Sequence, residues 1–343
     1  MAEVGDSLVV VEVSGVSEAG PGGFRLGRKA RVFLLFGLLV FLVFAGLFYL
    51  QKKAPPLAAR LLPESDAIVY FNVAPLRAVS GFGARPVVHD PDYQRFIDGT
   101  GIEFERDLSQ AAFALHRMPN PLGPNGAVAY SSIFVGKFDH TRLANYLAGI
   151  AQSTEDYDGR EIYNIQVEGR TDRVAILASD AVAVSNTPTA EQIHSILDRN
   201  RTAFLPFGGN TLLAQRYGDV PVFSEAWGLG KLGVGLSDGL NVLGFRIPLS
   251  VDATFIASLR WAGELHLRVE EIAPNSAAAS VSATSLEALL GIFKTAENVL
   301  PTTATSAETK ALLDSVQIDN HNERAVLTAT IPVGLVRKLA ADK

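Results

Sequence analysis

The chain has 343 residues, a formal net charge of −6 and no cysteine. The lack of cysteine excludes disulfides, thiolate nucleophiles and cysteine-based zinc sites. Charges balance over residues 1–31, so the acidic excess belongs to the rest of the chain, which is a poor electrostatic match for nucleic acid. Apolar residues make up 48% of the chain, a share typical of globular proteins.

Residues 32–50 form an apolar run that no charged side chain interrupts. At about 1.5 Å per residue the run spans roughly 29 Å, close to the hydrocarbon thickness of a bilayer. A cleaved signal peptide has a shorter apolar region and is not preceded by a polar tail such as residues 1–31. The sequence therefore predicts one uncleaved transmembrane helix at 32–50, with the lipid bilayer as its partner, after a disordered tail at 1–31.

Basic residues are denser before this span than after it. Those before it are Arg25, Arg28, Lys29 and Arg31, and those after it are Lys52, Lys53 and Arg60. The positive-inside rule then predicts a cytoplasmic N-terminus. We expect a single-pass protein of the cell membrane whose large C-terminal part is extracytoplasmic, which in a bacterial envelope means periplasmic.

A short linker at 51–60 carries Pro55 and Pro56, which favour an extended spacer. A first strand is predicted near 67–73 because alternate residues are apolar. A loop rich in turn formers then separates two further apolar segments, 111–118 and 127–134. This arrangement predicts an antiparallel hairpin.

Asp139 is a good N-cap for a helix whose apolar residues recur at helical spacing up to Ile150. A second helix is predicted to start at Thr187-Pro188, with the proline at its first position. Between the two helices we expect short strands at 161–167, 173–178 and 181–185.

The C-terminal half follows a similar plan. Residues 255–261 and 265–270 alternate between apolar and polar, which predicts two half-buried antiparallel strands. A long helix around Leu286, a hairpin turning at 320–322 and a closing helix at 333–341 complete the chain.

The predicted fold class is therefore α+β, with antiparallel sheets and packed helices. Because strand–strand–helix recurs, we predict two related lobes, 61–205 and 206–343. A short echo between Phe134-Val135-Gly136 and Ile331-Pro332-Val333-Gly334 favours a duplication.

Two glycine-rich motifs resemble functional loops. Residues 228–233 match G-x-G-x-x-G, but no amphipathic helix follows, as a dinucleotide site requires. Residues 235–239 match the nucleophile elbow around Ser237, yet Asp238-Gly239 is typical of a turn into a strand. We interpret both as connectors and predict no cofactor.

The remaining polar motifs do not define a site either. Residues 156–159 resemble part of a calcium loop but lack the later ligands, so a tight turn is expected. Glu103, Glu105 and Asp107 are interpreted as a solvated helix start. Residues 200–202 fit a glycosylation sequon, which has meaning only in a eukaryotic secretory path. No two histidines stand at the H-x-H or H-E-x-x-H spacing of metal sites. The histidines are His89, His116, His140, His194, His266 and His321.

The chain resembles a group of uncharacterised, membrane-anchored bacterial proteins assigned to domain-of-unknown-function families. The resemblance rests on residues 62–67, 134–139 and 157–163, with the helix at 277–290 in addition. It implies a repeated α+β extracytoplasmic domain over most of residues 61–340. It transfers no activity and no site residues.

Two functions remain open. The first is an anchored, non-enzymatic envelope protein that binds a partner protein, a lipid or a surface polymer, or serves as a structural spacer. The alternative is an anchored hydrolase whose catalytic set, with Ser237 as one candidate, is assembled from distant residues. The sequence identifies no catalytic, cofactor or metal residue, and it favours the first hypothesis.

Overall fold

In the computed structural model, residues 54–80, 89–203, 209–231, 240–242, 245–247, 252–299 and 307–335 are described. They all belong to one compact unit, Lys52–Lys343. The predicted transmembrane helix at 32–50 and the tail before it lie outside the described residues, as do Ser237 and the end of the predicted closing helix.

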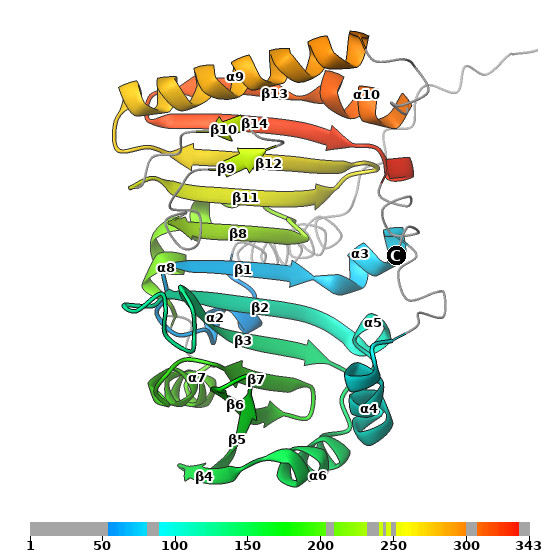
Figure 1. The fold of residues 1–343 in the computed structure, drawn as a ribbon, viewed down its shortest axis with the longest axis vertical. Coiled ribbons are helices and arrows are strands. Elements are labelled where there is room, and N and C mark those ends of the chain that lie inside the picture. Colours follow the sequence, from blue (N-terminus) through cyan, green and yellow to red (C-terminus); the bar gives the residue numbers. More distant parts are fainter. Residues whose placement is uncertain are drawn as a thin grey trace, which may run out of the picture. The chain divides into compact units, whose positions relative to one another are not determined.

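Most strands join one 12-stranded sheet in the order β13-β14-β12-β11-β8-β1-β2-β3-β7-β6-β5-β4 (Figure 1). Every pairing between described strands is antiparallel, which confirms the α+β class with a large antiparallel sheet. The strands are β1 Ala67–Asn72, β2 Leu108–Arg117, β3 Val128–Gly136, β4 Ser153–Tyr157, β5 Arg160–Val167, β6 Arg170–Ala178, β7 Ala181–Ser185, β8 Ala226–Lys231, β9 Leu240–Val242, β10 Phe245–Ile247, β11 Thr254–Trp261, β12 Leu265–Ile272, β13 Gln317–His321 and β14 Arg324–Ile331.

In the sequence the helices alternate with groups of strands, and in space they pack along the sheet (Figure 1). The strands β9 and β10 form a separate two-stranded sheet. The helices are α2 Leu57–Arg60, α3 Val73–Ser80, α4 Pro91–Thr100, α5 Phe104–Asp107, α6 His140–Ile150, α7 Glu191–Arg201, α8 Thr211–Arg216, α9 Ser276–Val299 and α10 Ala307–Ser315, with a 3-10 turn η1 at Tyr217–Asp219.

The two predicted lobes contribute to the same sheet, because β1 pairs with β8. Ala67 faces Gly230 in this pairing. Gly230 has a φ of 153°, and a Cβ atom there would lie 2.4 Å from the Cα of Ala67. Glycine is therefore required where the strands meet so closely. The predicted lobe boundary at 205/206 falls outside the described residues.

Alternation along the strands gives the β1–β7 part of the sheet two apolar faces. On one face, Ile68, Ile133 and Ile162 are fully buried with side chains of α2, α7 and α8. On the other face a second cluster joins Leu143 and Leu147 of α6 to strands β5, β6 and β7. Both faces are thus covered, which explains why β7 and the second part of β6, residues 174–178, are almost entirely apolar.

One predicted helix start is wrong. The helix predicted at Thr187-Pro188 begins at Glu191, and its N-cap residue, Ala190, provides no side-chain hydrogen bond. Thr187 is buried instead, and its hydroxyl donates to the carbonyl of Thr189 at 3.0 Å. The hydroxyl is used in a local turn, which delays the helix.

The long helix α9 packs against β13, β14 and α10. Its residues Ser276–Thr295 have a mean hydropathy of 1.3, and by length and composition alone this stretch could cross a membrane. Only 17% of an 18-residue window in this stretch is buried, and further residues such as Leu286 and Leu289 are half-buried.

Candidate functional site

The glycine motifs do not form ligand loops in the described part of the chain. Gly228 and Gly230 lie within β8, and not at a turn between a strand and a helix. The last two residues of that motif, Leu232 and Gly233, and the whole elbow around Ser237 lie outside the described residues. Residues 156–159 connect β4 to β5, and Asp158 and Gly159 have φ values of 56° and 77°. These values are typical of a hairpin turn, which confirms the predicted tight turn.

A serine and a histidine meet inside the sheet. The Nε2 atom of His116 on β2 lies 3.0 Å from the Oγ atom of Ser131 on β3, which contacts Ser185 on β7 at 3.1 Å. Burial lowers the pKa of His116 and outweighs two effects that raise it, the charge of Asp66 and a hydrogen bond from the imidazole to the backbone of Glu64. Ser131 has no exposed surface and lines neither cavity described below. This pair therefore stabilises strand contacts and offers a substrate no access.

An apolar cavity of about 280 Å3 lies between the helices α4 and α6 and one face of the sheet. Its volume is near the lower end of the roughly 300–1,000 Å3 range of small-molecule sites. Aromatic residues line it from the helices and β3, and aliphatic residues line it from β5, β6 and β7. These side chains include Phe96, Phe134, Tyr146, Ile165, Val182 and Val184.

The wall of this cavity is built by two well-capped helices. Asp90 caps α4 by accepting from the amide of Asp92 at 2.8 Å, and Gly101 ends the helix in the left-handed conformation. Asp139 caps α6 by accepting from the amides of Thr141 and Arg142, as the sequence predicts. Both helices therefore have fixed starting points at the cavity.

Two contacts hold α4 against α6. The Nη2 atom of Arg142 donates to the carbonyls of Asp98 and Gly99 at 3.1 and 3.4 Å, at the C-terminal end of α4. A Cβ atom on Gly99 would lie 2.5 Å from the ring of Tyr146. Only glycine allows the helices to approach this closely, so Gly99 sets the position of an aromatic residue that lines the cavity.

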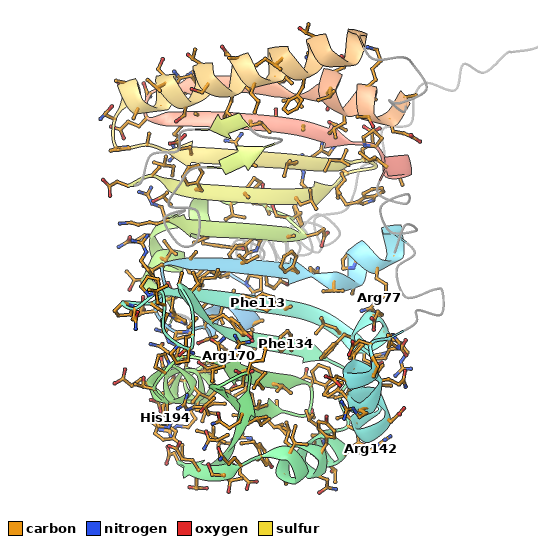
Figure 2. All side chains as sticks on the ribbon, in the orientation of Figure 1. Arg77, Phe113, Phe134, Arg142, Arg170 and His194 are labelled. Atoms are coloured by element: carbon orange, nitrogen blue, oxygen red, sulfur yellow. The ribbon has the colours of Figure 1, made fainter. Side chains whose placement is uncertain are left out.

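A row of phenylalanines continues from the cavity across the sheet. Phe104 lies 6.2 Å from Phe134 between ring centroids, Phe134 lies 5.7 Å from Phe113, and Phe113 lies 6.4 Å from Phe71. Figure 2 shows Phe113 and Phe134 on neighbouring strands. Phe71 and Phe104 are each 38% exposed. The apolar surface of the cavity therefore extends to solvent.

Asp172 on β6 is the charged residue among the described residues that line the cavity. Burial raises its pKa, although the charge of Arg170 acts in the opposite direction. The Nε atom of Arg170 lies 3.7 Å from the Oδ1 atom of Asp172, too far for a hydrogen bond. Both atoms are buried and have no hydrogen-bond partner in the described part of the chain. A donor and an acceptor without hydrogen bonds therefore lie next to each other, with Asp172 at the cavity wall.

A second cavity, of about 530 Å3, lies over the C-terminal half of the sheet and is polar. Its side chains come from β11, β12 and β14, and they include Ser258, Arg260, His266, Arg268, Thr328 and Thr330. Arg268 forms an ion pair with the buried Glu270 at 2.7 Å. This groove differs in chemistry from the apolar cavity.

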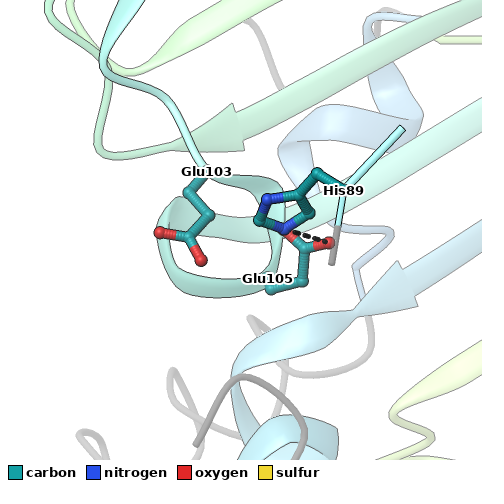
Figure 3. A group of neighbouring side chains, drawn as sticks. All are labelled: His89, Glu103 and Glu105. Atoms are coloured by element: carbon teal, nitrogen blue, oxygen red, sulfur yellow. Dashed lines mark ion pairs between the residues drawn. The ribbon is translucent and has the colours of Figure 1, made fainter. Parts of the chain in front are cut away.

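The acidic residues 103–107 are not simply a solvated helix start. The helix start itself is confirmed by α5, but Asp107 is buried and accepts from the amide of Glu103 at 2.9 Å. Burial alone would raise its pKa, yet hydrogen bonds from Arg106 and Glu103 lower it. The side chain of Glu105 is only 15% exposed and lies beside His89 (Figure 3).

No protein-family model and no curated protein matches the chain. Among solved structures, crystal form III of TP0453 aligns with 83% of this chain and 96% of its own, at a TM-score of 0.46 and 13% identity. Crystal form I aligns with 84% and 97%, at a TM-score of 0.44 and 13% identity. Likenesses of this size carry no inference on function, and the resemblance to anchored bacterial proteins of unknown function stays a prediction.

Most of the cavity was not foreseen from the sequence. The sequence predicts the helix α6 and the strands β5 to β7, but it does not predict the helix α4. The available signal was Asp90-Pro91, an N-cap followed by proline at the first helical position, with Gly101 as the C-cap. Asp172 gives no sequence signal, because only the fold places it beside an apolar cavity.

Proposed function

We propose that this chain is a membrane-anchored binding protein of the cell envelope whose extracytoplasmic domain holds a small apolar ligand. The cavity beneath α4 and α6 carries the proposal. Its walls are apolar apart from Asp172 in the described part of the chain, and they include several aromatic rings. A concave apolar site with a few convergent polar groups is the usual form of a small-molecule site. The anchor at 32–50 and the extracytoplasmic location rest on the sequence.

The polar groups suggest the chemistry of the ligand. A hydroxyl group both donates and accepts, so it can satisfy Asp172 as donor and Arg170 as acceptor. A carboxylate has no proton to donate to Asp172 and would face its charge. We therefore infer a ligand with an apolar chain and a hydroxyl group at one end.

The test is a comparison of chain-matched ligands on the full-length protein in lipid nanodiscs. Dodecanol, dodecylamine and dodecanoate are titrated by calorimetry, with empty nanodiscs as the background for partition into lipid. We expect dodecanol to bind the protein most tightly. Asp172→Asn should weaken dodecanol about tenfold, since a hydrogen bond to a charged group contributes roughly 1.5–3 kcal/mol.

A variant that fills the cavity separates specific binding from adsorption. Val184 lines the cavity and is half-buried, so Val184→Phe places a ring in the space that the ligand needs. Val281→Phe adds the same ring at a position of α9 that is 60% exposed, and it is the matched control. Loss of binding in Val184→Phe alone supports the proposal. Equal binding in both variants refutes it.

The hydrolase alternative has no support from the described residues. The buried pair of Ser131 and His116 is closed to substrate, and Ser237 lies outside the described residues. A turnover assay with p-nitrophenyl esters tests this alternative independently. Hydrolysis that Ser237→Ala abolishes would establish the enzyme, whatever the outcome of the binding experiment.

A further inference from the structure

His89, Glu103 and Glu105 bring three metal-ligating side chains together outside the apolar cavity (Figure 3). One ligand atom from each lies within 4.8 Å of the other two. Two of the side chains are largely buried, with exposed fractions of 12% for His89 and 15% for Glu105. Glu103, which also accepts from Arg106 at 3.0 Å, is 32% exposed and forms the open side.

The histidine is oriented with one ring nitrogen toward this cluster. Its Nδ1 atom lies 3.4 Å from the amide oxygen of Gln94, which is an acceptor only. A proton on Nδ1 therefore suits this contact and leaves a lone pair on Nε2. The Nε2 atom is buried, has no hydrogen-bond partner among the described residues, and faces Glu105 at 3.7 Å. Two acceptors that face each other can be satisfied by a metal ion between them, or by a proton on the imidazole.

Glu105 is held in place as a metal ligand would be. The hydroxyl of Tyr93 donates to its Oε2 atom at 2.7 Å, which leaves Oε1 directed at His89. Tyr93 in turn accepts from the amide of Phe104 at 2.7 Å, and its ring packs edge-on against His89 at 4.9 Å. Such outer partners orient the ligands of metal sites.

We propose that His89, Glu103 and Glu105 bind a divalent first-row transition-metal ion, with zinc as the reference case. An imidazole with two carboxylates suits zinc, whereas calcium and magnesium take oxygen ligands only. Zn–N and Zn–O distances are about 2.0–2.2 Å, so the three side chains close by about an ångström on binding. Water completes the coordination on the side of Glu103. This proposal does not depend on the apolar cavity.

The experiment titrates zinc into the untagged full-length chain in detergent and follows thermal unfolding. A ligand at a hundredfold excess over its Kd should raise the Tm by roughly 5 °C. His89→Ala and Glu105→Gln should each abolish the rise. Glu105→Gln keeps an acceptor for Tyr93, so it removes the ligand charge without removing the hydrogen bond. Cobalt should give a visible absorption band that both variants lose.

The matched control is a second histidine–carboxylate pair. The Nε2 atom of His194 lies 2.7 Å from Glu155, and these two residues belong to no metal-ligating group of the described chain. His194→Gln should leave the response to zinc unchanged. The proposal is overturned if zinc produces no rise in the intact chain, or if His89→Ala retains it. A protonated His89 paired with Glu105 would then account for the geometry.

Discussion

The two halves of the large sheet share a strand order and differ in their side chains. Outward from the central pair, one half runs β1-β2-β3-β7-β6 and continues with β5 and β4, and the other runs β8-β11-β12-β14-β13. In one half the helix α6 follows β3, and β7, the second strand of a later hairpin, pairs with β3. In the other half the helix α9 follows β12, and β14, the second strand of a later hairpin, pairs with β12. We refer to them as the β1 half and the β8 half.

The difference between the halves lies in what covers the faces. In the β1 half both faces are apolar, and the helices α4 and α6 leave the apolar cavity against one of them. In the β8 half one face carries the polar groove around Arg260 and Arg268. A common topology therefore supports two surfaces of opposite chemistry, and the site is determined by side chains and not by the strand order.

The largest expected effect comes from removing the predicted anchor. Residues 57–343 contain nearly all of the compact unit Lys52–Lys343, so they should fold as a soluble protein with one cooperative thermal transition. Circular dichroism of the fragment without detergent provides the measurement. Recovery only in detergent would mean that the body contacts the membrane, with the apolar helix α9 of the β8 half as the first candidate.

A core substitution should affect the halves unequally. Ile162 on β5 is completely buried in the apolar cluster beneath α7, so Ile162→Ala should lower the free energy of unfolding by about 2–5 kcal/mol. Leu259 on β11 is only half-buried, and Leu259→Ala should lower it by less. Chemical denaturation of both variants measures the difference. Equal losses would show that the β8 half is packed as tightly as the β1 half.

Two glycine substitutions should act in opposite directions. Gly99→Ala brings a methyl group against the ring of Tyr146 and should cost roughly 1–3 kcal/mol, with a change in the cavity wall. Gly291 in α9 has no atom within 4 Å of an added Cβ. Gly291→Ala should therefore stabilise the protein by about 0.5–1 kcal/mol. Stabilisation by Gly99→Ala would exclude the close helix contact.

The smallest effect concerns pH. Burial holds the pKa of His116 below the ordinary histidine value of 6.5, so the unfolded chain takes up this proton first as the pH falls. This contribution to the free energy of unfolding is complete above pH 6.5 and is lost as the pH falls through the lower folded-state pKa. His116→Gln should flatten that part of the stability profile. His266→Gln, in the polar groove of the β8 half, is the control, and an identical flattening there would refute the assignment.

Much of the fold was accessible from the sequence because the strands alternate clearly. The hairpin of β2 and β3, the hairpin of β11 and β12, and the helix capped by Asp139 are all present, with ends within a few residues of the prediction. These elements have strong local signals, namely turn residues, caps and a regular apolar period. The pairing of β1 with β8 has no local signal, because it joins segments far apart in the chain.

The sequence echo illustrates the same limit. Phe134-Val135-Gly136 ends β3, whereas Ile331-Pro332-Val333-Gly334 begins at the end of β14. The strand order makes β12 the counterpart of β3, and it makes β7 the counterpart of β14. The echo therefore does not lie at equivalent positions. The likeness of the halves is in topology, which short sequence matches do not reveal.

The candidate site was the least predictable part. Its residues come from α4, α6 and strands of the β1 half, and in the sequence they resemble ordinary apolar core residues. They line a cavity only because the fold places α4 and α6 over the sheet with space between them. Similarly, His89 is a candidate metal ligand only because α5 places Glu105 beside it. Side-chain chemistry assembled by tertiary contacts leaves no spacing pattern in the sequence.

The most direct test of the central claim is to map where a hydroxylated acyl chain binds. A dodecanol derivative with a photoreactive diazirine near its end is crosslinked to the full-length chain in nanodiscs, and the modified peptides are identified by mass spectrometry. We predict crosslinks in α4, α6 and strands β5 to β7, lost in Val184→Phe and retained in Val281→Phe. Crosslinks confined to α9 or to the groove of the β8 half, and unchanged by Val184→Phe, would contradict the account.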